Sequence, residues 1–153
     1  MRLELTKAYI AHSVYRFIQL VFALAVCGLY GVDLNRANKA GKYSDGKWIY
    51  AEITASLSAF TALLYLAPFT ARIPFIFVWD LILFILWIAL FGLFGNMYIK
   101  EDAEGNAGIK RMKNAVWIDL VNALLWLVSA MAMAIFWVRH RGQRSLWTGR
   151  AKV

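Results

Sequence analysis

The stretch that decides the fold is residues 78–94, Val-Trp-Asp-Leu-Ile-Leu-Phe-Ile-Leu-Trp-Ile-Ala-Leu-Phe-Gly-Leu-Phe. It is apolar on every side, so a helix formed by it is buried all round, in protein or in lipid. Extended to residues 75–97, it exceeds the ~20 residues that cross a hydrocarbon core of ~30 Å. Its one ionisable group is Asp80, and a carboxylate inside a membrane helix costs about 2.5–3.5 kcal/mol. We therefore predict a membrane span in which Asp80 faces a protein partner and not lipid.

The composition of the whole chain is that of a membrane protein. Hydrophobic residues make up 61% of the 153 residues, against about 45–50% in soluble globular proteins. The formal net charge is +8. Because no nucleic-acid-binding motif accompanies the basic residues, we interpret this charge as attraction to anionic lipid head groups, and we expect no nucleic-acid partner. The single cysteine, Cys27, excludes a disulfide framework and is expected to pack among apolar residues.

The same criteria predict four spans, at about residues 10–31, 49–68, 75–97 and 115–138. The chain is therefore expected to be an all-α membrane protein, a four-transmembrane-helix bundle over residues 1–138. Polar loops are expected at residues 32–47 and 98–114, and a basic tail without any acidic residue follows at 139–153. The beginning of the chain also resembles a signal peptide, but Gln19 interrupts its apolar run early, so we favour a retained span.

The few polar residues inside these spans have depths that predict their partners. Arg16 lies near the start of the first span and Asp80 near the start of the third. Because odd-numbered spans run in the same direction, the two lie at similar depth, and we predict that they pair. The alternative is that Arg16 snorkels to the head groups and Asp80 meets water. Gln19 lies one turn from Arg16 on the same helix face. Asp119 and Glu52 lie near the opposite surface, Asn122 lies one turn from Asp119, and we expect these three groups to make hydrogen bonds between helices.

Two further patterns predict how the helices pack. In the second span Ala51, Ala55 and Ala59 recur every four residues, and such a ridge of small side chains lets helix backbones approach closely. In the third and fourth spans each aspartate is followed seven residues later by a tryptophan, Trp87 or Trp126. Residues seven apart share a helix face, and both indoles approach the middle of the membrane. We therefore place both tryptophans inside the bundle, where each N–H needs an acceptor.

The sequence contains none of the common catalytic motifs, such as His-Glu-x-x-His, Gly-x-Ser-x-Gly or a phosphate-binding loop. His12 and His140 lie at opposite ends of the chain without a second ligand at metal-binding spacing. We predict a protein that is not an enzyme, with no metal and no cofactor. The alternatives are a small transporter or channel subunit that uses Asp80 and Asp119 as an ion or proton path, and an accessory subunit of a larger membrane complex. The apolar stretch between the two acids disfavours the transporter.

An ordered set of motifs resembles the small fungal branch of the MARVEL-domain (membrane-associating domain) family. The resemblance covers about residues 8–138 and is carried by Arg16-x-x-Gln19, Gly28-Leu29-Tyr30-Gly31, Trp79-Asp80-x-x-Leu83-Phe84-x-x-Trp87-x-x-x-Phe91-Gly92-x-Phe94 and Trp117-x-Asp119-x-x-Asn122-x-x-Leu125-Trp126. It implies a four-span bundle in the plasma membrane or secretory pathway, without catalytic residues. It also implies a scaffold that organises membrane microdomains or vesicle traffic, often near sterol- or sphingolipid-rich regions.

The resemblance also implies which side of the membrane the ends of the chain face. Basic residues are almost equally divided between the two sides of the predicted bundle, so the positive-inside rule does not choose an orientation. The family has both termini in the cytoplasm, which would direct Arg139, Arg141 and Arg144 of the tail at the anionic leaflet. The expected mechanism is lateral helix association through small-residue faces, as a homo-oligomer or with another membrane protein, combined with lipid contacts.

Overall fold

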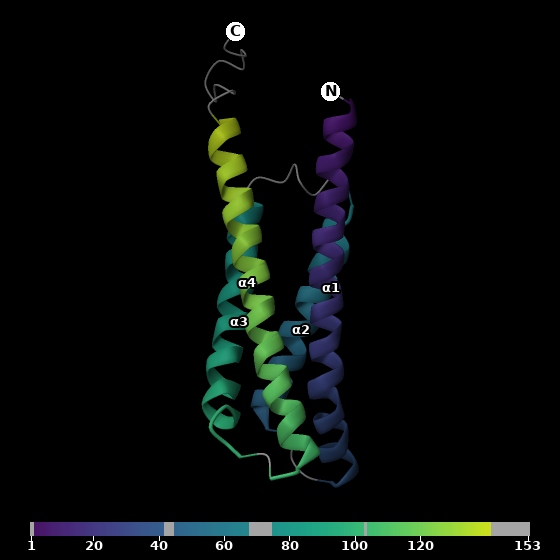
Figure 1. Cartoon of the computed structure of the whole chain (residues 1–153), viewed down its shortest axis with the longest axis vertical. Helices are drawn as coiled ribbons and strands as arrows, with labels where there is room; N and C mark the ends of the chain where they lie inside the picture. Colours follow the sequence, from purple (N-terminus) through teal and green to yellow (C-terminus); the bar gives the residue numbers. More distant parts are fainter. Residues whose placement is uncertain (1, 42–44, 68–74, 103, 142–153) are drawn as a thin grey trace.

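The computed structural model describes residues 2–41, 45–67, 75–102 and 104–141, with side chains from residue 7 to residue 139 within these ranges. They form four helices, α1 (Arg2–Lys39), α2 (Gly46–Tyr65), α3 (Ile76–Tyr98) and α4 (Ala107–Arg141). The helices lie side by side along one long axis, and α1 and α3 run antiparallel to α2 and α4 (Figure 1). Helix α4 packs along α3 and α1, and α2 packs along α1 and less extensively on α3. The start of α1 and the end of α4 therefore lie at the same end of the structure.

Three described segments are long and apolar enough to cross a membrane: Lys7–Lys39, Ile76–Tyr98 and Ala107–Arg139. This agrees with the prediction of an all-helical membrane protein. Helix α2, which contains most of the predicted second span, is 20 residues long but is not among them. Much of α2 consists of alanine, serine and threonine, which contribute less hydrophobicity than leucine, isoleucine or phenylalanine.

Helix α3 matches its predicted bounds to within one residue, but α1 and α4 are longer than predicted. The loop expected at residues 32–47 is wrong for 32–39, because α1 continues to Lys39, and for 46–47, because α2 begins at Gly46. Its last turn carries Arg36 and Lys39, which suit the negative end of the helix dipole. The helix ends where Gly41 adopts a φ of 62° and its N–H bonds to the carbonyl of Asn38 at 3.1 Å, as a left-handed glycine does after many helices.

The loop expected at residues 98–114 is likewise wrong for 107–114, since α4 begins at Ala107. Asn106 supplies the reason, because its Oδ1 accepts a hydrogen bond from the Gly108 N–H at 2.9 Å. Asparagine at such a position caps the start of a helix. At the start of α2, Asp45 accepts from the Lys47 N–H at 3.2 Å in the same way. Both extra helical segments are polar, so hydrophobicity did not reveal them.

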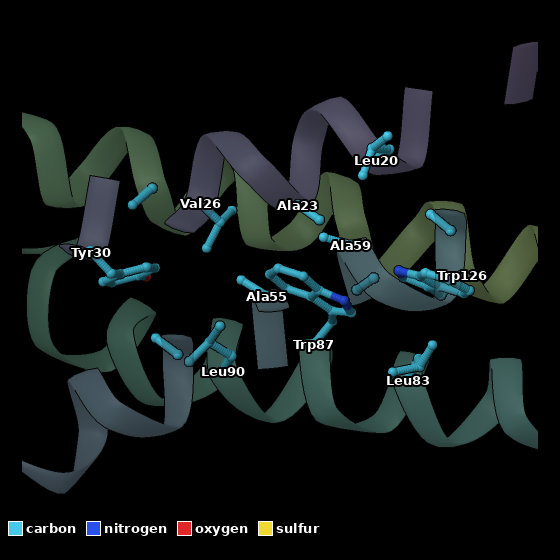
Figure 2. Packing of buried hydrophobic residues seen from close by; sticks show 14 of the residues in the cluster. Leu20, Ala23, Val26, Tyr30, Ala55, Ala59, Leu83, Trp87, Leu90 and Trp126 are labelled. Atoms are coloured by element: carbon cyan, nitrogen blue, oxygen red, sulfur yellow. The ribbon is translucent and has the colours of Figure 1, made fainter. Parts of the chain in front are cut away.

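The core is a column of side chains that runs along the axis of the four helices (Figure 2). Its largest apolar members, all fully buried, are Tyr30, Leu83, Trp87, Leu90, Phe94 and Trp126. The outward faces of the helices are also apolar: the most exposed side chains include Ile53 at 61%, Phe60 at 60% and Phe17 at 58%. In a membrane protein such exposed apolar faces are expected to contact lipid.

Candidate functional site

The most unusual feature of the interior is a buried ion pair between α1 and α3. The side chains of Arg16 and Asp80 are 2% and 0% exposed, and Arg16 Nη2 lies 3.5 Å from Asp80 Oδ2. Ser129 of α4 donates a hydrogen bond from Oγ to the same carboxylate oxygen. The predicted pairing is confirmed, and the alternative that Arg16 reaches the head groups is wrong. Because α1 and α3 are parallel, both residues lie about the same distance from the same end of the structure.

The guanidinium of Arg16 is held by groups from other positions along the chain. Its Nη1 donates to Gln19 Oε1 at 2.7 Å, and Gln19 Nε2 donates to the carbonyl of Leu125 on α4 at 3.4 Å. The Tyr65 ring of α2 lies 4.3 Å from Arg16 Cζ, and the Trp126 ring lies 5.8 Å away. These distances allow cation–π attraction, which is stronger for a desolvated cation. The charged layer of Arg16, Gln19, Asp80 and Ser129 therefore has contacts with all four helices.

Sequence reasoning missed two members of this environment, Tyr65 and Ser129. Tyr65 stands three residues before Pro68 at the end of the predicted second span, a position typical of an aromatic residue at the membrane surface. The structure buries it to 6% exposed. Ser129 stands ten residues after Asp119 in the same predicted span, and only the packing of α3 on α4 brings it to Asp80. No local sequence signal distinguishes either residue.

The two tryptophans are both fully buried, which confirms their predicted place in the interior. Trp87 Nε1 donates to Ser58 Oγ of α2 at 2.8 Å, so its N–H has the acceptor that was expected. Trp126 differs, because its Nε1 has no acceptor in the part of the chain that the structure describes. Its ring instead lies on the Arg16 side of the core, at an edge-on angle to Tyr65 with ring centres 6.3 Å apart.

A second buried carboxylate, Asp119 of α4, lies nearer the other end of the bundle and is 0% exposed. Its Oδ2 accepts a hydrogen bond from the Tyr30 hydroxyl of α1 at 2.6 Å, so the predicted bond between helices is confirmed for Asp119. The same prediction is wrong for Asn122, whose Nδ2 donates to the carbonyl of Ile118 at 3.1 Å within α4 itself. A side chain can reach the carbonyl one turn earlier in its own helix, and here that local partner is the one used.

The alanine ridge of α2 packs inside the chain. Ala51 and Ala55 are 0% exposed and Ala59 is 7% exposed. Figure 2 places Ala55 beside the indole of Trp87, and Ala59 near Ala23 of α1. The prediction that these residues pack helices together is confirmed. Their burial within the chain leaves little surface for the expected contact with a second copy.

The tail positions expected to meet lipid head groups are described only in part. Arg139 is exposed near the end of α4, and the helix continues to Arg141, past the predicted end of the span at 138. The side chain of Arg141 and the whole of Arg144 lie outside the described residues.

The polar groups of this interior neutralise each other's charge and hold the helices together. Between Asp80 and Asp119 the core is filled by side chains with no exposed surface, Leu83, Trp87 and Leu90 of α3 among them. Among the residues that the structure describes, no three His, Cys, Asp or Glu side chains come together as a metal site would require.

The comparisons with known proteins give no further guide, since no family model, curated protein or solved structure matches this chain. The likeness to the MARVEL-domain family therefore stays a prediction from the motifs.

Proposed function

We propose that this chain is a non-enzymatic, four-span integral membrane protein of the MARVEL type. In this proposal it organises membrane microdomains or vesicle traffic in the plasma membrane or secretory pathway. The observation that carries the proposal is that the charged layer is buried and its two charges pair with each other. Arg16 and Asp80 neutralise each other at 3.5 Å, with 2% and 0% of their side chains exposed. A group that transports ions needs access to water or substrate, whereas this arrangement is suited to holding helices together.

Helix α2 is included as a span because of its two faces. Toward the core it presents Ser58, bonded to Trp87, and the ring of Tyr65. Toward the outside it presents Ile53 and Phe60, which are 61% and 60% exposed. Its 20 residues match the ~20 that a helix needs to cross the hydrocarbon core. A helix with large exposed apolar side chains along its outer face is best accommodated in lipid.

The number of spans is tested by labelling single cysteines in a Cys27→Ser background. Lys39→Cys is the last residue of α1, Lys100→Cys follows α3, and Arg139→Cys lies near the end of α4. In sealed vesicles an impermeant maleimide should label Lys39→Cys and Lys100→Cys from the same side, and Arg139→Cys from the opposite side. Labelling of Lys39→Cys and Lys100→Cys from opposite sides would mean that α2 does not cross, and the four-span topology would be abandoned.

Scaffolding and transport are distinguished by reconstitution of the full chain. In giant vesicles of sterol, sphingolipid and unsaturated phosphatidylcholine, the labelled protein should concentrate in, or at the edge of, ordered domains. Proton and sodium flux should equal that of empty vesicles, for the wild type, Asp80→Asn and the control Asp33→Asn alike. A uniform distribution in the vesicles would contradict the scaffold. If the wild type conducts ions and only Asp80→Asn loses this flux, the proposed function would be transport and not scaffolding.

Lateral association in this proposal uses the outward faces of the helices, because the alanine ridge of α2 is covered within the chain. The partner, a second copy or another membrane protein, would contact side chains that are exposed in the single chain. Purification in native lipid followed by mass spectrometry of the bound lipids and proteins would identify it. Isolation of a single chain with no enrichment of any lipid or protein would count against the scaffold.

A further inference from the structure

The end of the structure opposite the start of α1 and the end of α4 contains a surface depression of about 220 Å³. We call it the loop-end pocket. Every helix or its flanking residues contributes to its lining, which includes Asp33, Arg36, Trp48, Tyr98, Asn106 and Arg111. One water molecule occupies about 30 Å³ in the liquid, so the pocket has room for a larger group. Neither the proposed scaffold function nor the charged layer at the other end uses this site.

The lining carries one more positive charge than negative. Arg111 forms an ion pair with Asp33, with side chains 18% and 23% exposed. Arg36, one turn along α1 from Asp33, is exposed and has no ion-pair partner among the described residues. The Nε of Arg111 is buried and has no acceptor within the described part of the chain. Two guanidinium groups therefore border the pocket, and the one carboxylate is already neutralised.

The start of α4 adds to this positive character. Asn106 and Gly108 both line the pocket, and the N-terminal end of a long helix carries a partial positive charge. A Cβ at position 108 would lie 3.1 Å from Asn106 Oδ1 and 3.9 Å from Arg111 Nη2. Glycine thus avoids a tight contact with the capping oxygen of Asn106, whereas a Cβ would touch the guanidinium only at an ordinary contact distance. Anions are favoured where the first turn of a helix meets arginine side chains.

The remaining lining is aromatic and apolar, which a site for a small soluble anion would not need. The Phe94 ring packs edge-on against Trp48 with ring centres 5.3 Å apart, and it stacks on Tyr98 with ring centres 6.3 Å apart. Ile109 and Met112 complete the apolar part of the pocket. Tryptophan and tyrosine at the ends of membrane helices mark the level of the lipid head groups. A cationic group beside an aromatic wall at this level matches the junction between a phosphate and its glycerol.

We propose that the loop-end pocket binds the phosphodiester of an anionic phospholipid in the leaflet opposite the one that meets the basic tail. Arg36 and Arg111 bind the phosphate oxygens, and Trp48 and Tyr98 pack against the glycerol region. Inorganic phosphate offers similar oxygen acceptors, but the aromatic wall and the position of the pocket at the helix ends favour a lipid. Electrostatic attraction to the leaflet surface alone would not discriminate between Arg36 and its basic neighbours.

The test uses the full chain and a matched pair of variants on the last turn of α1. Arg36→Gln and Lys39→Gln each remove one positive charge, but only Arg36 lines the pocket. The protein is placed in nanodiscs of phosphatidylcholine with and without phosphatidylglycerol. Native mass spectrometry then counts the lipids that stay bound to the protein after it is released from the nanodiscs. A third set of nanodiscs, of phosphatidylcholine alone, receives millimolar inorganic phosphate.

We expect the wild type and Lys39→Gln to retain one phosphatidylglycerol in preference to phosphatidylcholine. Retention by Arg36→Gln should be about tenfold weaker, as expected for the loss of a charge-assisted hydrogen bond. Equal losses in the two variants, or equal retention of the two lipids, would overturn the proposal in favour of unspecific attraction to the leaflet. Binding of inorganic phosphate in the nanodiscs of phosphatidylcholine alone that is lost in Arg36→Gln would assign the pocket to a soluble anion instead. Cysteine labelling and vesicle flux do not enter this assay, so its outcome is independent of the proposed scaffold.

Discussion

Substitution of Asp80 with asparagine is expected to destabilise the protein more than the loss of any other single acid in the described helices. Asparagine keeps the shape of the side chain but removes the charge, which leaves the buried guanidinium of Arg16 without its counter-charge. At the 3.5 Å separation of Nη2 and Oδ2, the Coulomb attraction is about 5 kcal/mol at an effective dielectric constant of ~20. Removal of one partner from a buried pair costs about 3–5 kcal/mol in measured cases. We therefore expect Asp80→Asn to lower the free energy of unfolding by about 3–5 kcal/mol.

The chain contains a matched control for this prediction. Asp33 and Arg111 form a pair of the same kind near the end of the bundle, but their side chains are 23% and 18% exposed. Water screens such a pair, and partly exposed pairs contribute about 0.2–1 kcal/mol. Asp33→Asn should therefore lower the free energy of unfolding by no more than about 1 kcal/mol. The contrast between the two substitutions isolates the effect of burial from the effect of removing a carboxylate.

The measurement is reversible unfolding by sodium dodecyl sulfate in mixed micelles, followed by circular dichroism. The double variant Arg16→Gln/Asp80→Asn completes the cycle, because it removes both charges and leaves neither one buried alone. It should be more stable than the sum of the two single substitutions implies, by about 2 kcal/mol or more. If Asp80→Asn and Asp33→Asn prove equally mild, or if the effects of Arg16→Gln and Asp80→Asn simply add, the ion pair does not stabilise the packing of the helices.

Two other substitutions test the remaining interior contacts. Tyr30→Phe removes the hydroxyl that donates to Asp119 at 2.6 Å, and the fully buried carboxylate then lacks this donor; the same titration should show a loss of about 1–3 kcal/mol. Ala55→Leu places three extra carbon atoms where α2 meets the core at a position with 0% exposure, and overpacking of this kind costs about 1–3 kcal/mol. Because Ala55 is covered within the chain, light scattering in detergent should show an unchanged oligomeric state for Ala55→Leu.

Each of these substitutions has a control of the same type on the outer surface. Tyr9→Phe removes a hydroxyl from a side chain that is 48% exposed. Ala25→Leu adds the same three carbon atoms as Ala55→Leu, but at an exposed position of α1. Both should alter the free energy of unfolding by less than about 0.5 kcal/mol. Controls that prove as damaging as Tyr30→Phe or Ala55→Leu would mean that the outer faces are packed against protein. If Ala55→Leu alone changes the oligomeric state, the alanine ridge contributes to an interface between copies of the chain.

The limits of prediction differ from residue to residue. The pairing of Arg16 with Asp80 followed from depth and direction alone, because both residues lie near the same end of parallel helices. The role of Asn122 did not follow, since its amide could reach either another helix or the carbonyl of Ile118, and depth does not distinguish the two. The loop-end pocket was not foreseen either. It depends on α1 and α4 extending past their apolar segments. There the ends of the helices are set by capping and helix dipoles, and hydrophobicity gives no signal.

The sequence by itself determined that this chain is helical and has the apolar segments of a membrane protein, and that its few buried charges need partners inside the chain. Hydrophobicity and depth vary along one dimension, and the order of residues specifies both. Only the tertiary structure decided which face of each helix turns inward. It brought Ser129 to Asp80 and Tyr65 over Arg16, and it covered the alanine ridge of α2 within the chain. The rotation and crossing of a helix depend on how all four surfaces pack at once, and no single segment contains that information.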